Sequence, residues 1–272
     1  MHKDQHTQQD YETDEILQNE SLQSCCGAEG TPTETIPLAT TSDKYKIFRV
    51  ENNPLPGDRS ELKIGILGGT FNPPHMGHLR LAEEAVFAHG LDRAVFIPAS
   101  VPPHKDTKEI AGSRHRLEMT RRACRGNPCF EVSDVELTLE GTSYTVKTLQ
   151  LFAKDPDNEI FFILGADSLR EIPTWRDYEE LFSLSSFIVV NRPGTDFETA
   201  WAELPSSLRL RFRQGDGFLA HSSSHLLIPS PVKGLDISST RIRSLLRQGL
   251  SIRYLVPESV RTYILENHLY GC

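Results

Sequence analysis

Two histidines in one short segment are the side chains of this chain best suited to chemistry. His75 and His78 lie three residues apart in the run IGILGGTFNPPHMGHLRLAEEA, residues 64–85. On a helical turn this spacing places both imidazoles on one side, where they can stabilise developing negative charge. Gly77 leaves space for a ligand between them. Ordinary capping or surface histidines are the alternative, and the strand and glycine turn before them favour a ligand site.

The loop before the histidines has the composition of a phosphate site. Gly68 and Gly69 directly follow an apolar run of strand length, and glycines let the backbone approach a ligand closely. The N–H groups of Gly69, Thr70 and Phe71 can then point at phosphate oxygens. The N-terminus of the following helix also favours an anion. Neither a Walker loop nor a G-x-G-x-x-G fingerprint occurs here, so the segment predicts a different kind of phosphate site.

Metal binding is the alternative chemistry for two histidines at this spacing. Zinc needs a third Cys, His or Glu ligand, and none stands at metal spacing nearby. We therefore predict no metal ligands in the protein. The cysteines include no C-x-x-C pair, and an odd, unpatterned set fits reduced thiols without a functional role. They are Cys25, Cys26, Cys124, Cys129 and Cys272.

The elements that must position these residues are indicated from residue 61 onward. Strand-length apolar runs alternate there with helix-length amphipathic stretches, which predicts a parallel sheet with crossover helices. The predicted strands are 62–67, 94–98, 130–135, 159–165, 186–191 and 225–229. The predicted helices are 77–89, 113–124, 143–154, 175–183, 200–213, 238–248 and 257–266.

The first sixty residues differ in composition from the rest. They are rich in Gln, Thr, Ser, Glu and Asp and have few periodic apolar positions, so they cannot offset the entropy cost of ordering. We predict a disordered acidic N-terminal extension over residues 1–60, with the run at 44–50 as an edge strand, and one domain over residues 61–272.

The charge balance argues against nucleic acid as a partner. The chain has 29 Lys+Arg against 37 Asp+Glu, a net charge of −8, which repels a polyanion such as DNA. Residues 1–60 carry 5 of the basic and 11 of the acidic side chains, so the predicted domain is nearly neutral. The basic cluster at 121–125 is interpreted as a solvated helix face. No apolar run approaches the ~18 residues of a membrane span, and no signal-peptide pattern opens the chain. We expect a cytoplasmic protein without a membrane partner.

Several motifs together resemble one enzyme family. GGTFNPPHMGH at 68–78 resembles the H-x-G-H motif of the nucleotidyltransferase superfamily, and ISSTRIR at 237–243 resembles the element that completes the nucleotide site in small adenylyltransferases. VPPHKD at 101–106, TSYTVKTL at 142–149 and LGADSLREIPTWRDY at 164–178 resemble, in order and spacing, blocks of bacterial nicotinate-nucleotide adenylyltransferases. The resemblance covers nearly all of residues 62–270.

The resemblance implies both a fold and a reaction. The fold is α/β, a Rossmann-like open parallel sheet of the nucleotidyltransferase type with helices on both faces. The reaction transfers the AMP moiety of ATP to nicotinate mononucleotide, forming deamido-NAD and pyrophosphate, with Mg²⁺ bound through the triphosphate. The expected partners are these small molecules, and a homo-oligomer is left open.

The resemblance also implies roles for individual residues. His75 and His78 would be catalytic. The residues implied to bind ATP and its phosphates are Gly68, Gly69, Thr70, Phe71, Gly165, Asp167, Ser238, Ser239 and Arg243. Those implied to bind the nicotinate nucleotide are Lys105, Tyr144, Thr145 and Trp175. Trp175 would stack on the cationic pyridine ring. Arg241 is expected to be exposed, and a helix N-cap is the competing role for Asp167.

Two alternative functions stay open from the sequence. The first is an adenylyltransferase for nicotinamide mononucleotide or for both substrates. Backbone donors near Tyr144 and Thr145 would suit the nicotinate carboxylate better than a carboxamide, but one peptide flip would change that preference. The second is a nucleotide-binding or regulatory module without turnover, which the intact histidine motif disfavours.

Overall fold

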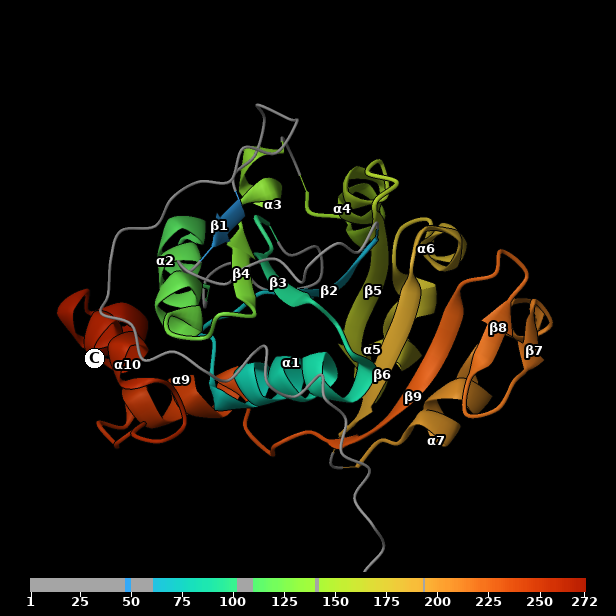
Figure 1. Ribbon diagram of the computed structural model, residues 1–272. Helices are drawn as coiled ribbons and strands as arrows, with labels where there is room; N and C mark the ends of the chain where they lie inside the picture. The colour runs from blue at the N-terminus through green and yellow to red at the C-terminus, as the bar shows by residue number, and fades with distance from the viewer. Residues whose placement is uncertain (1–46, 50–60, 102–109, 140–141, 193) are drawn as a thin grey trace, which may run out of the picture. The chain divides into compact units, whose positions relative to one another are not determined.

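The computed structural model describes residues 47–49, 61–101, 110–139, 142–192 and 194–272 (Figure 1). Lys105 lies outside the described residues, as does the predicted extension apart from residues 47–49. The described residues all belong to one unit of the chain, Pro32–Cys272.

Nine strands of the described residues form one sheet, in the order β1-β4-β3-β2-β5-β6-β9-β8-β7. The strands are β1 (Ile47–Arg49), β2 (Leu62–Gly69), β3 (Arg93–Pro98), β4 (Phe130–Ser133), β5 (Asn158–Gly165), β6 (Ser186–Asn191), β7 (Phe212–Gln214), β8 (Leu219–His221) and β9 (Leu226–Lys233). Six adjacent strands, β4, β3, β2, β5, β6 and β9 in their order across the sheet, are parallel to one another. Counted along the chain, these six run 3-2-1-4-5-6, the Rossmann order, which reverses between β2 and β5. The predicted Rossmann-like fold is confirmed.

The edges of the sheet depart from the predicted all-parallel arrangement. β1 pairs antiparallel with β4, which confirms the edge strand expected at 44–50. At the other edge β8 pairs antiparallel with β9, and β7 with β8. The β7–β8 hairpin was not predicted. Its turn has Gly217 at φ +75° and a hydrogen bond from Gly215 N–H to the Phe218 carbonyl.

Helices cover both faces of the sheet. They are α1 (Met76–His89), α2 (Ser113–Cys124), α3 (Val135–Thr138), α4 (Thr145–Phe152), α5 (Ala166–Glu171), α6 (Tyr178–Leu184), α7 (Phe197–Glu203), α8 (Ser206–Arg209), α9 (Ser239–Arg247) and α10 (Glu258–Glu266), with 3-10 turns η3 (Ile172–Thr174) and η4 (Leu269–Gly271). In Figure 1 the red helices α9 and α10 lie beside α2. No helix in the described ranges has both the length and the apolar character to cross a bilayer.

The core explains why the strands are apolar on both sides. Ile64 and Ile66 of β2 pack, with Phe162 of β5, against the buried faces of α4 to α8. The intervening positions of β2, such as Leu67, are also buried, and α1 contacts β2 and β3. A parallel strand covered on both faces reads as a continuous apolar run. These rigid strands hold the loops that follow them.

Two predicted elements were wrong in detail. The helix predicted at 200–213 is split into α7, α8 and β7. Asp196 caps α7 early by accepting from Thr199 N–H at 2.8 Å, and Pro205 cannot continue that helix. The strand predicted at 130–135 ends at Ser133, because Asp134 is the N-cap of α3 and Val135 its first residue.

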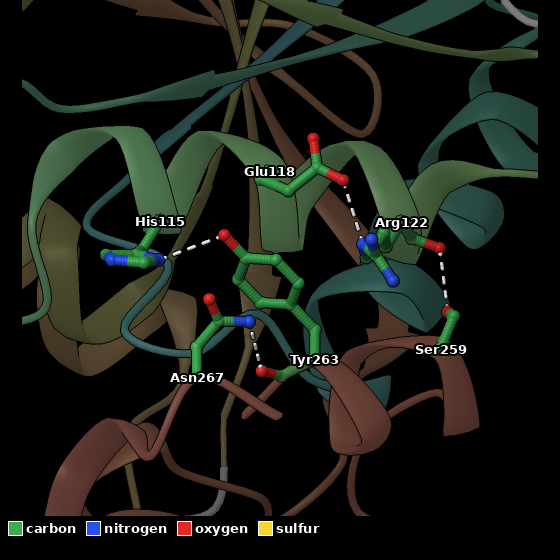
Figure 2. A network of polar contacts seen from close by, with 6 residues as sticks. All are labelled: His115, Glu118, Arg122, Ser259, Tyr263 and Asn267. Atoms are coloured by element: carbon green, nitrogen blue, oxygen red, sulfur yellow. Dashed lines mark hydrogen bonds and ion pairs between the residues drawn. The ribbon is translucent and has the colours of Figure 1, made fainter. Parts of the chain in front are cut away.

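The basic cluster at 121–125 is only partly solvated. Arg121 forms an ion pair with Asp134 at 3.8 Å. Arg122 donates to Glu118 at 2.8 Å and lies over the ring of Tyr263 at 4.6 Å (Figure 2). The cluster therefore joins α2 to neighbouring elements, and the interpretation as a solvated face was wrong for these two arginines.

Candidate active site

The glycine pair and Gly165 meet at the point where the strand order reverses. Gly68 and Gly69 end β2, Gly165 ends β5, and the two strands are parallel neighbours. Ligands of open α/β sheets bind outside the carboxyl ends of the strands at this point. Gly68 is exposed, and a Cβ there would make only ordinary contact with Phe162 at 3.5 Å. The backbone of this residue is therefore accessible to a ligand.

The loop between β2 and α1 has a defined and buried course. Phe71 has a left-handed backbone, φ +48°, and its ring is 2% exposed. That ring meets the His78 ring edge-on, with centroids 5.0 Å apart. Asn72 is buried as well, and its side-chain Oδ1 accepts from Ala111 N–H at 3.0 Å. The loop is thus a fixed support for the histidines that follow it.

The two histidines lie against each other as the spacing predicted. Their ring centroids are 3.7 Å apart and the planes differ by 27°. His78 Nδ1 accepts from the backbone N–H of His75 at 3.2 Å. The neutral His78 ring therefore carries its proton on Nε2, where it is a donor. A Cβ at Gly77 would lie 3.0 Å from His75 Nδ1, so glycine at that position lets the His75 ring keep its place.

His75 is neutral at physiological pH. Burial, followed by the positive charge of Arg192, lowers its pKa from 6.5 to about 3. Its buried side chain takes part in the capping box at the start of α1, in which each histidine side chain pairs with the backbone N–H of the other histidine. His75 therefore contributes as a neutral imidazole rather than as a cation.

Arg116 of α2 is a residue that the sequence analysis missed. Its side chain is fully buried and donates to three carbonyl oxygens: Thr70 at 2.9 Å, Ser100 at 2.8 Å and Ala111 at 2.9 Å. It thereby ties together the loops that follow β2 and β3. An arginine next to buried Leu117 on an amphipathic helix was the available sequence signal.

The C-terminal motif contacts the same loop. Ser239 Oγ donates to the Pro73 carbonyl at 2.9 Å, and Arg243 Nη1 donates to the Asn72 carbonyl at 3.0 Å. Ser238 is the N-cap of α9 and accepts from Arg241 N–H at 3.2 Å. Arg241 is exposed, as expected. The phosphate roles of these residues stay predictions, while their contacts position the histidine loop.

A second unpredicted arginine lies at the carboxyl end of β6. Arg192 Nε is 3.8 Å from Asp167 Oδ1, and a Cβ on Gly165 would come within 2.9 Å of that nitrogen. Asp167 is the second residue of α5 and Gly165 is the N-cap, so the alternative role of Asp167 as an N-cap was wrong. Arg192 directly follows a predicted strand, and this position was the signal that could have identified it.

Of the residues assigned to the nicotinate end, Tyr144, Thr145 and Trp175 lie on two turns that contact each other. Tyr144 is the N-cap of α4 and Thr145 its first residue. The Arg176 guanidinium lies 5.0 Å from the centre of the Tyr144 ring, which joins this turn to the Trp175 turn. Trp175 is half-buried and meets the Phe162 ring edge-on at 6.2 Å. The backbone N–H of Trp175 donates to the Ile172 carbonyl at 2.8 Å and so stabilises the turn between them.

Metal-ligating side chains do not gather in the part of the chain that the structure describes. No three His, Cys, Asp or Glu side chains there form a group that could hold an ion. Asp167, the carboxylate at the end of β5, is paired with Arg192. The site therefore offers cationic and neutral donors, which suit an anionic ligand.

Known proteins are similar to this chain in sequence and in fold. A family model described as cytidylyltransferase-like matches residues 66–245. A probable nicotinate-nucleotide adenylyltransferase of Citrifermentans bemidjiense is 46% identical over 212 residues, which cover 77% of this chain and 98% of that protein. One of Desulfitobacterium hafniense is 47% identical over 209 residues, covering 76% of this chain and 95% of the relative. The solved structure of Plasmodium falciparum nicotinic acid mononucleotide adenylyltransferase complexed with NaAD superposes with a TM-score of 0.56 at 19% identity, covering 77% of this chain and 98% of that chain. That last likeness is one of fold.

Proposed function

Because the chain belongs to the nicotinate-nucleotide adenylyltransferase family, we propose that it transfers the AMP moiety of ATP to nicotinate mononucleotide. The products are deamido-NAD and pyrophosphate, and the reaction is a step of NAD biosynthesis. The observation that carries this proposal is the stacked pair His75 and His78 at the start of α1, beside the glycine turn that ends β2.

The reaction needs no general base. The second pKa of a phosphate monoester is about 6, so the attacking oxygen of nicotinate mononucleotide is already ionised at pH 7. This oxygen bonds to the α-phosphorus of ATP as the bond from that phosphorus to the bridging oxygen of pyrophosphate breaks. Catalysis then consists of aligning the two substrates and stabilising charge on the α-phosphate and the leaving group.

The histidines suit the α-phosphate. Protonated at Nε2, His78 can donate to a non-bridging oxygen, and the α1 N-terminus adds its positive dipole end. Arg192, whose charge acts on His75, and the N-terminus of α9, whose Ser239 contacts the histidine loop, would neutralise the departing pyrophosphate. Mg²⁺ would enter as the MgATP substrate, held by phosphates and water, because the described residues provide no ligand cluster. Removal of free divalent ions with EDTA is expected to abolish turnover, and added Mg²⁺ to restore it.

The local charge near Tyr144 supports nicotinate over nicotinamide. Arg176 and Lys147 both lie close to the Tyr144 ring, the latter at 5.7 Å. These two cations, one of them also paired with Asp177 at 3.4 Å, favour the anionic carboxylate of nicotinate over the neutral carboxamide. Lys105, outside the described residues, stays a predicted contact of the nucleotide. We also propose that the protein acts in the cytoplasm, where both substrates are available.

Pyrophosphate release tests the function directly. Purified protein with MgATP is offered nicotinate mononucleotide, nicotinamide mononucleotide or phosphopantetheine in parallel. We expect release with the first at a kcat/KM at least tenfold above the second, and none with the third. A preference for either of the others would refute the substrate, and silence with all three would favour a binding module without turnover.

A further inference from the structure

We propose that Tyr270 is a positioning residue, whose hydroxyl holds the histidine loop through Asn72 in the geometry required for catalysis. This inference rests on the proposed function, because its main readout is adenylyl transfer. Tyr270 lies in η4, 198 residues along the chain from its partner. None of the motifs discussed above includes it.

The contact falls on a loop residue that two other hydrogen bonds also hold. Tyr270 OH donates to Asn72 Oδ1 at 2.8 Å, and the same oxygen accepts from Ala111 N–H. The Asn72 carbonyl accepts from Arg243 Nη1. Asn72 is 4% exposed, so water cannot readily replace a lost donor there. Three hydrogen bonds from three separate segments thus hold a residue that stands three positions before His75.

The donor itself is well suited to this role. Burial raises the pKa of Tyr270, despite the nearby positive charges of Arg243 and Arg116, so the phenol keeps its proton over the working pH range. Its backbone is left-handed, φ +67°, in the turn after α10, and its hydroxyl reaches the loop from there. Tyr270 therefore provides a permanent donor from a fixed direction.

Helix α10, which precedes Tyr270 in the chain, packs against α2 independently of this hydrogen bond. Val260 and Ile264 of α10 are fully buried in a cluster with Met119 of α2. Figure 2 shows polar contacts beside them: Tyr263 OH lies 2.9 Å from His115 Nδ1, and Ser259 Oγ donates to the Arg122 carbonyl at 3.0 Å. Loss of the Tyr270 hydroxyl would therefore remove one of the hydrogen bonds that hold the loop, while α10 stays attached to α2.

A loop that shifts by a fraction of an ångström would move His75 and His78 relative to the α-phosphate. Misplacement of catalytic groups by about 1 Å can cost ~10²-fold in rate. The nicotinate end of the site is built on other turns, around Tyr144 and Trp175, so its affinity should not follow the loop. The expected signature is a fall in kcat with an unchanged KM for nicotinate mononucleotide.

The test compares two tyrosine-to-phenylalanine variants of the full chain. Tyr270→Phe removes the hydroxyl that reaches the loop, and Tyr263→Phe removes a hydroxyl with a similar hydrogen bond that does not. Both are expected to lower Tm alike, by about 2–4 °C. Tyr270→Phe is expected to lower kcat about tenfold, while Tyr263→Phe stays within twofold of the wild type. With 4-aminophenylalanine at position 270, which restores an N–H donor, kcat should recover.

The outcomes separate the two proposals. A wild-type protein that releases no pyrophosphate refutes the proposed function before any variant is compared. If the wild type is active and Tyr270→Phe retains its kcat, or loses it no more than Tyr263→Phe does, the positioning role is wrong. A rise in KM for nicotinate mononucleotide at constant kcat would likewise overturn it.

Discussion

The buried neutral imidazole of His75 makes a quantitative prediction about stability at acid pH. Its pKa is about 3 in the folded protein and 6.5 when unfolded. Between these values the unfolded chain binds a proton that the folded protein does not, so stability must fall as the pH drops below 6.5. At pH 5, which is 1.5 units below the unfolded pKa, the loss from this one residue is about 2 kcal/mol.

The perturbation is His75→Gln, which replaces the imidazole with a side chain that does not titrate. The free energy of unfolding is measured by urea denaturation at pH 7.5 and pH 5, for the wild type and for the variant. Other buried histidines, such as His221, whose pKa is lowered by burial, contribute to both proteins and cancel in the comparison. The variant is expected to lose about 2 kcal/mol less than the wild type on going to pH 5.

Equal losses in the two proteins would refute the reasoning. They would mean that His75 is protonated as readily in the folded protein as in the unfolded chain, and hence that burial does not lower its pKa from 6.5. The absolute stability of the variant does not enter this argument, since only the difference between two pH values is compared.

Further outcomes are expected for other variants of the site. His78→Ala should lower kcat by ~10²–10³ with little change in KM for ATP, measured by pyrophosphate release. Gly68→Ala should have a free energy of unfolding within about 0.5 kcal/mol of the wild type, yet should raise KM for ATP. Gly65→Ala, whose Cβ would come within 2.7 Å of Ile163, should instead lose about 1–3 kcal/mol of stability; the reverse ranking would contradict the site geometry. Trp175→Ala should raise KM for nicotinate mononucleotide about tenfold, as stacking contributes about 1–3 kcal/mol. In Trp201→Phe, where Trp175 is the remaining tryptophan, that nucleotide should quench the fluorescence.

The parallel strands were predictable because each is buried on both faces and therefore has a continuous run of apolar residues in the sequence. The strand predicted at 186–191 matches β6, and helix α2 also begins and ends as predicted. The β7–β8 hairpin was missed because its strands have three residues each, too few to reveal a period. The boundary at residue 60 stays a prediction, although β1 lies before it and pairs with β4.

The candidate site was predictable where its residues lie in one local segment. The histidine pair and the glycine turn could be read directly, since strand, turn and helix follow one another along the chain. The contacts of Asn72 with Arg243 and Tyr270 could not be read, because they join segments 171 and 198 residues apart and no local pattern records such a pairing. Arg116 was missed for a related reason, since its three acceptors are backbone carbonyls, which every residue has.

The distance along the chain between Asn72 and Tyr270 has a consequence for biosynthesis. A ribosome makes the histidine loop 198 residues before it makes the tyrosine that braces it. The strands and α1 can assemble on the emerging chain, whereas the brace can form only after residue 270 has left the exit tunnel. We therefore expect ribosome-bound chains to acquire the fold before they acquire full activity, so that catalytic competence comes late in synthesis.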